Sequence, residues 1–76
     1  MVAANHSARV SLGKRCRALR LRRGLSQLDM VRNFEWSLSH YQKIERGALD
    51  ARLSTLLRLA ECFRVSLSEL VRGVHG

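Results

Sequence analysis

Two short helices joined by a tight turn, within residues 25–47, constrain the fold of this chain more than any other feature. Ser26 can cap the first helix, and Asp29, three residues later, completes a capping-box pattern. Ser37 can open the second helix, which ends where an arginine is followed by a glycine, a common helix stop signal. Helices this short cannot bury their apolar faces alone, so the rest of the chain must supply a scaffold.

Apolar residues recur at helical spacing on both sides of this pair, and no segment alternates with the period of a strand. The spacing predicts helices over about residues 11–23, 27–33, 38–46 and 53–63, and a last one that begins after Ser66. Residues 1–10 are interpreted as a flexible N-terminal arm. We therefore expect an all-α domain over residues 11–73, with the turn-linked pair at about residues 26–47.

The net charge of this 76-residue chain is +8, and the excess is unevenly placed. Seven basic residues and no acid lie within residues 1–25, whereas residues 26–52 hold four bases and four acids. Such charge favours a polyanionic partner, with nucleic acid first and an acidic protein or membrane surface behind it. A small basic domain that contains two turn-linked helices predicts helix-turn-helix DNA binding.

Polar side chains share one face of the predicted helix at residues 38–46, opposite the apolar Tyr41 and Ile44. They are Ser39, Gln42, Lys43 and Arg46. Glutamine can pair with adenine, lysine with guanine acceptors and serine with either, whereas an arginine at a helix end suits a phosphate. A helix face that is merely exposed to solvent would have a similar composition. The DNA-binding interpretation of this face is therefore favoured by the turn between the helices and by the net charge.

Over residues 12–71 the chain resembles the Xre family, the phage-repressor and Cro-like helix-turn-helix proteins. The resemblance rests on six motifs in the family's order and spacing: Leu12-Gly13, Leu19-Arg20, Gly24-Leu25-Ser26-Gln27, Ile44-Glu45-Arg46-Gly47, Leu53-x-x-Leu56-Leu57-x-Leu59-Ala60 and Val65-Ser66-Leu67-x-Glu69-Leu70. It implies a compact five-helix, lambda-repressor-like domain, usually a homodimer on a palindromic operator. The second helix of the pair would enter the major groove, with two copies one helical turn apart, ~34 Å.

The resemblance also implies roles for individual residues. The expected base-reading residues are Gln27, Leu38, Ser39, Gln42 and Lys43. The expected phosphate contacts are Ser26, Ser37, Arg46 and Arg52. Leu38 offers no hydrogen bond there, although it can pack on a thymine methyl. Arg20 and Glu45 match a family pair that forms a buried salt bridge, so their expected role is structural.

The chain departs from the family pattern at its turns. Glu35 and Arg64 stand where relatives usually carry a glycine, and both positions tend toward positive φ. Trp36 replaces a smaller apolar residue, and we expect it to pack against the preceding helix or to lie partly exposed near DNA. Leucines occupy three positions that are often polar in relatives, and they can mark a dimer or partner surface. These are Leu21, Leu28 and Leu49.

The expected function is that of a sequence-specific transcriptional regulator, a dimeric repressor that binds double-stranded DNA. The alternative is an antitoxin-like or other protein-interaction module that binds an acidic partner. No enzyme activity, cofactor or metal is expected, because the three histidines have no paired nucleophile or carboxylate and no glycine-rich phosphate loop is present. Cys16 and Cys62 fit no metal or redox spacing and are expected to be buried thiols. Without an apolar signal or membrane-spanning run, a cytoplasmic location is expected.

Overall fold

The structure, a computed structural model, describes residues 2–75, with side chains from residue 6 onward. Over these residues the chain forms helices and loops without a strand. The helices are α1 (Val2–Arg22), α2 (Gln27–Phe34), α3 (Leu38–Arg46), α4 (Leu53–Phe63) and α5 (Leu67–Leu70). The all-α, five-helix prediction is therefore confirmed, and the predicted bounds of α3 and α4 match the observed ones.

Helix α1 begins much earlier than the sequence predicted. The segment over residues 2–10, expected as a flexible arm, is the first part of this helix, so that expectation is wrong for its backbone. Ala3, Ala4 and Ala8 favour helix, and no proline or glycine precedes residue 13. The extension also packs on the domain, since Val10 lies directly against Gly47 at the end of α3. Met1 lies outside the described residues.

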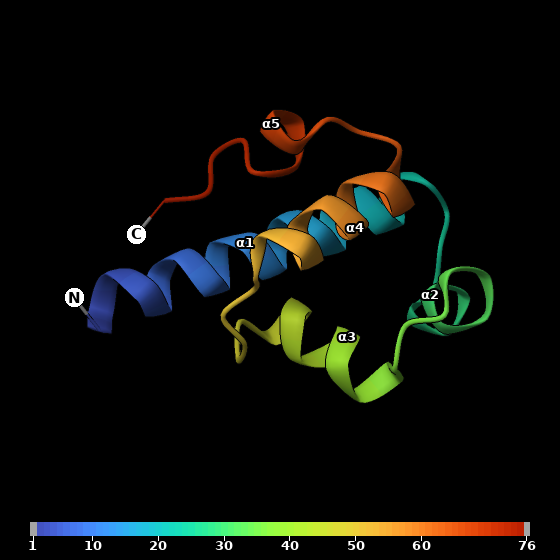
Figure 1. Cartoon of the computed structure of the whole chain (residues 1–76), viewed down its shortest axis with the longest axis horizontal. Helices are drawn as coiled ribbons and strands as arrows, with labels where there is room; N and C mark the ends of the chain where they lie inside the picture. The colour runs from blue at the N-terminus through green and yellow to red at the C-terminus, as the bar shows by residue number, and fades with distance from the viewer. Residues whose placement is uncertain (1, 76) are drawn as a thin grey trace.

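Helix α1 runs through the middle of the molecule, with α3 on one side and α5 on the other (Figure 1). Every helix contributes a fully buried side chain to one core: Leu19, Met30, Tyr41, Leu59 and Leu70. Both cysteines are buried free thiols, as expected. Burial raises the pKa of the Cys16 thiol to about 12, so that it stays protonated. No helix within residues 2–75 is both long enough and apolar enough to cross a membrane.

Helices α1 and α3 approach each other closely at Gly13. A Cβ atom at this position would collide with the carbonyl oxygens of Ile44 and Glu45. Any larger residue would therefore push the two helices apart, because backbone atoms at this contact cannot move aside as a flexible side chain can. Gly13 thus sets how deeply α3 sits on the scaffold.

Trp36 joins the turn between α2 and α3 to α4. Its side chain is only 2% exposed, and its indole Nε1 donates a hydrogen bond to the Sγ of Cys62 at 3.2 Å. The guanidinium of Arg58 lies 4.0 Å from the ring centroid and donates a hydrogen bond to the carbonyl oxygen of Phe34. The expectation that Trp36 lies partly exposed near DNA is therefore wrong. The indole is buried and packs against α4 instead.

Glu35 and Arg64 close α2 and α4 in the left-handed conformation, so these turns keep the positive φ of the family's glycine positions. Their φ angles are 61° and 55°, and each backbone N–H donates to carbonyl groups in the last turn of the preceding helix. The hydrogen bonds keep these turns in place even though a side chain with a Cβ atom disfavours this conformation.

Replacing Glu35 by glycine removes this local strain, and we expect the free energy of unfolding to rise by about 1 kcal/mol. Asn33→Gly is the matched control, because Asn33 lies inside α2, where glycine should lower stability by up to ~1 kcal/mol. Urea denaturation followed by circular dichroism measures both changes. A Glu35→Gly protein that is less stable than the original chain would show that the turn is not strained.

Candidate nucleic-acid interface

Both helices of the turn-linked pair begin at a serine whose hydroxyl caps the helix. The Oγ of Ser26 accepts from the backbone N–H of Asp29 at 3.0 Å, and the N–H of Ser26 donates to the Asp29 carboxylate at 2.8 Å. These hydrogen bonds hold the pKa of Asp29 below its usual value. The Oγ of Ser37 accepts from the N–H of His40 at 3.3 Å. The sequence-predicted capping box is therefore present, and two predicted phosphate-contacting residues, Ser26 and Ser37, lie exposed at helix starts.

The outward face of α3 carries most of the predicted contact residues. Ser39, Lys43 and Arg46 are exposed, Leu38 is half-buried, and the opposite face buries Tyr41 and Ile44 in the core as predicted. Arg52 lies apart from this group, exposed at the start of α4. The structure thus presents a polar and cationic stripe on a helix that the scaffold holds from behind.

A buried ion pair joins α1 to this helix. The Nε of Arg20 donates to one carboxylate oxygen of Glu45 at 2.6 Å, and its Nη2 donates to the other at 3.1 Å. Its Nη1 donates to the carbonyl oxygen of Leu25 at 2.7 Å, just before α2. Burial by itself raises the pKa of Glu45, but hydrogen bonds to its carboxylate outweigh that effect and lower the pKa. The carboxylate therefore stays ionised at neutral pH, and one arginine links all three helices.

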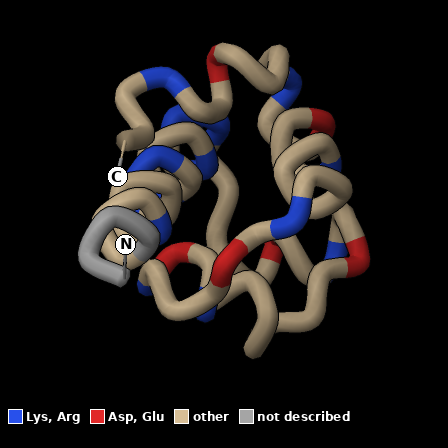
Figure 2. Tube along the Cα trace, turned by 60° about the vertical axis from the view of Figure 1, so that its left-hand side comes forward, with Lys and Arg blue, Asp and Glu red and all other residues tan. Residues whose placement is uncertain are grey.

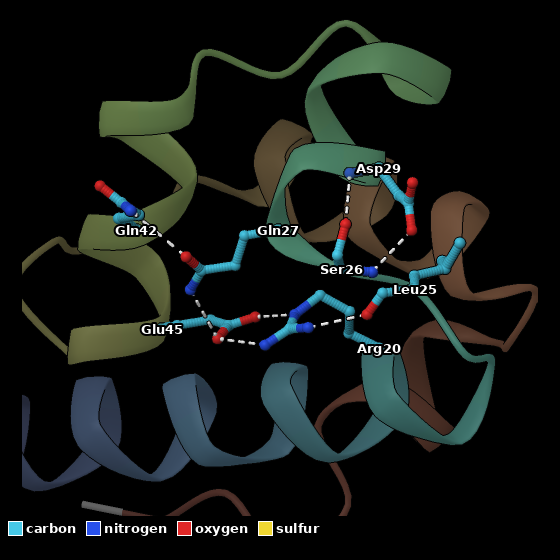
Figure 3. Close-up of polar contacts among 7 residues, drawn as sticks. All are labelled: Arg20, Leu25, Ser26, Gln27, Asp29, Gln42 and Glu45. Atoms are coloured by element: carbon cyan, nitrogen blue, oxygen red, sulfur yellow. Dashed lines mark hydrogen bonds and ion pairs between the residues drawn. The ribbon is translucent and has the colours of Figure 1, made fainter.

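The same carboxylate connects the core to the surface through two glutamines. The Nε2 of Gln27 donates to Oε1 of Glu45 at 3.1 Å, and the Nε2 of Gln42 donates to Oε1 of Gln27 at 3.3 Å. Figure 3 shows this chain of contacts from Arg20 to Gln42. Gln27 and Gln42, two of the predicted base-reading residues, are therefore half-buried neighbours held by each other. Ser39 and Lys43 have no such contact among residues 6–75 and extend freely from α3.

Arg17 is a residue that the sequence patterns missed. Its side chain is exposed on α1, and with Gln27, Gln42, Glu45 and Arg46 it lines an open pocket of about 360 Å³ between the first three helices. The only signal for it was the basic excess of α1, which Figure 2 shows as repeated Lys and Arg positions along that helix. Charge counting identified the helix but not the side that faces α2 and α3.

Two of the three leucines that the sequence suggested as a partner surface are exposed. Leu21 and Leu28 are about half exposed, at 50% and 48%, whereas Leu49 packs against the core. Two further leucines on α4 are exposed and lie one helical turn apart, Leu53 and Leu57. The apolar surface is thus divided between the α1–α2 end of the domain and α4.

Comparisons with known proteins agree with this arrangement. The family model described as a helix-turn-helix domain matches residues 11–72. A search of curated protein sequences found no match. The crystal structure of the restriction-modification controller protein C.AhdI from Aeromonas hydrophila is 33% identical with a TM-score of 0.73 and covers 80% of this chain and 92% of its own.

Two further solved structures have the same fold. The BldD DNA-binding domain of S. venezulae is 29% identical, with a TM-score of 0.75, over 84% of this chain and 94% of its own. The hypothetical transcription factor NHTF from Neisseria has a TM-score of 0.77 over 87% of this chain and 76% of its own, and its 23% identity supports the fold alone. The resemblance to phage-repressor and Cro-like proteins is confirmed by these matches.

Arg20→Ala leaves the Glu45 carboxylate buried without its partner, and we expect this to lower the free energy of unfolding by about 3–5 kcal/mol. That loss is a large part of the stability of a small domain, so the variant should be mostly unfolded at 37 °C. Thermal melting by circular dichroism measures the effect. Arg22→Ala is the control, because Arg22 lies exposed at the end of α1. An Arg20→Ala protein with the same melting temperature as the unchanged chain would refute the stabilising role of the ion pair.

Proposed function

This chain belongs to the helix-turn-helix domain family, and on that premise we propose that it is a sequence-specific DNA-binding regulator of transcription. One observation carries the proposal. The face of α3 that points away from the core exposes Ser39, Lys43 and Arg46, while Arg20 and Gly13 hold the helix firmly on α1. A rigid helix with an exposed hydrogen-bonding stripe has the shape and chemistry that the major groove of DNA accepts.

In this proposal α3 lies in the major groove and reads base edges. Lys43 would donate to guanine acceptors, Ser39 would donate or accept, and Leu38 would pack on a thymine methyl. The remaining contacts would go to the phosphate backbone. Arg46 and Arg52 supply charge there, and the exposed hydroxyls of Ser26 and Ser37 lie at helix starts, where the positive end of the helix dipole favours an anion.

We further propose that the protein acts as a homodimer on a palindromic operator and represses transcription by covering a promoter. One copy of α3 spans only part of a helical turn of DNA, so two copies ~34 Å apart would combine two weak half-sites into one specific site. The exposed Leu53 and Leu57 on α4 offer an apolar surface for such pairing. The name of C.AhdI as a controller protein and that of BldD as having a DNA-binding domain support a regulatory role.

A salt titration of binding tests this function. The probe is the DNA upstream of the protein's own gene, and the control is a shuffled duplex of equal length and composition. We expect tighter binding to the upstream DNA and a steep linear fall of log K with log salt, by ~0.9 for each phosphate neutralised. Equal binding to both duplexes at every salt concentration would contradict sequence-specific recognition.

The second candidate is a protein-interaction module, such as an antitoxin, that binds an acidic partner. Two features favour it: the basic residues along α1 (Figure 2), and the half-exposed Leu21 of α1 and Leu28 of α2, which can pack against a partner. Indifference to DNA sequence, combined with tight binding to the product of a neighbouring gene, would favour this candidate over the first.

Lys43→Ala and Arg46→Ala should separate base reading from backbone binding. We expect Lys43→Ala to relax the base preference at one position of each half-site by ~1–3 kcal/mol. Arg46→Ala should weaken binding to all sequences alike and reduce the salt slope by about 1 for each protomer bound. Binding measured against all single-base variants of one operator gives both profiles. An unchanged preference profile for Lys43→Ala would show that this face of α3 does not read bases.

A further inference from the structure

We propose that the pocket between α1, α2 and α3 is a preformed seat for a single phosphate of the DNA backbone, and that Arg17 binds this phosphate. The inference rests on the proposed function and assigns a contact to the scaffold helix rather than to the turn-linked pair. The pocket holds about 360 Å³ and is lined by Arg17, Gln27, Gln42, Glu45 and Arg46. Three helices therefore contribute side chains to one open hollow.

The charges around this pocket favour an anion. Arg17 and Arg46 are exposed, and neither forms an ion pair or side-chain hydrogen bond with any residue in the described part of the chain. The one acidic side chain in the lining is Glu45, and both of its oxygens are already bound by Arg20, at 2.6 and 3.1 Å. Its negative charge is therefore neutralised from behind, which leaves two guanidinium groups to determine the local potential.

The hydrogen bonds of Gln27 orient its amide for the same ligand. Because an ionised carboxylate can only accept, the side of Gln27 that meets Glu45 must be its NH₂ group. Its carbonyl oxygen is turned toward Gln42, from which it accepts a hydrogen bond. One N–H of Gln27 remains unused within this network, and an oxygen of a bound phosphate can accept it. Gln42 is then a positioning residue that holds Gln27, and little reorganisation is needed on binding.

A phosphate in this pocket would fix the register of α3 on the duplex. Arginine binds phosphate through two parallel N–H groups, so it specifies geometry as well as charge. Arg17 projects from α1, which Gly13 and Arg20 hold rigidly against α3. A contact from this scaffold would thus define how far α3 enters the groove, as backbone contacts do in other protein–DNA interfaces.

Arg17→Gln tests the seat, with Lys14→Gln as the matched control. Both residues are exposed cations on α1, but Lys14 lines a different hollow, with His6 and His75. Each variant loses one charge, and thermal melts should confirm that both stay folded. We expect Arg17→Gln to weaken binding to the operator roughly tenfold or more, as for one lost charge-assisted hydrogen bond. Its salt slope should fall by ~0.9 for each protomer bound, whereas that of Lys14→Gln should stay close to the original.

Operators with one neutral methylphosphonate linkage at a time locate the contact directly. With the unchanged protein, we expect neutralisation of one phosphate in each half-site to weaken binding, and we expect Arg17→Gln to be insensitive to that same linkage. If Arg17→Gln and Lys14→Gln changed the affinity and the salt slope equally, the proposed phosphate site would be wrong, although DNA binding itself would stand. If the unchanged protein showed no preference for any duplex, the proposed function would be wrong, and the phosphate site that rests on it would be wrong as well.

Discussion

The buried ion pair between Arg20 and Glu45 joins α1 to α3 and, through the carbonyl oxygen of Leu25, to the start of α2. Glu45 also contributes a backbone carbonyl that faces Gly13 of α1, and a third hydrogen bond from Arg20 reaches the backbone just before α2. Burying two charges costs free energy, which this pair offsets through a bidentate contact and a third hydrogen bond from the guanidinium to the carbonyl oxygen of Leu25. Together with the close backbone approach at Gly13, the ion pair therefore fixes the position of α3 on α1.

The carboxylate of Glu45 also orients polar side chains at the surface. Through Gln27 and Gln42 it sets the direction of a chain of hydrogen bonds that ends on the exposed side of α3. The low pKa of Glu45 keeps this direction constant, because a neutral carboxyl group could donate as well as accept. Stability and the orientation of the proposed contact residues thus depend on one ionised group. One exposed cation of α1, Arg17, lines the same pocket as these glutamines and Arg46.

Local features of this fold could be predicted from the sequence, because each is encoded within a few neighbouring residues. The caps at Ser26 and Ser37 and the bounds of α3 follow from such patterns, whereas the left-handed closure at Glu35 is indicated only by the resemblance, because relatives carry a glycine there. The start of α1 could not be predicted in this way, since alanines favour a helix without marking where it begins. The burial of Trp36 against α4 and the contact between Gln27 and Gln42 depend on how separate helices meet. Helical periodicity shows which residues share a face, but not which face they meet.

Selection of bound duplexes from a random pool, followed by sequencing, tests whether this scaffold presents α3 for sequence-specific reading of DNA as a symmetric pair. We expect one enriched site with two-fold symmetry, whose half-sites are centred one helical turn apart, ~34 Å or about 10 base pairs. Retention of DNA with no enriched sequence over successive rounds would contradict sequence-specific reading, because binding would then rest on charge alone.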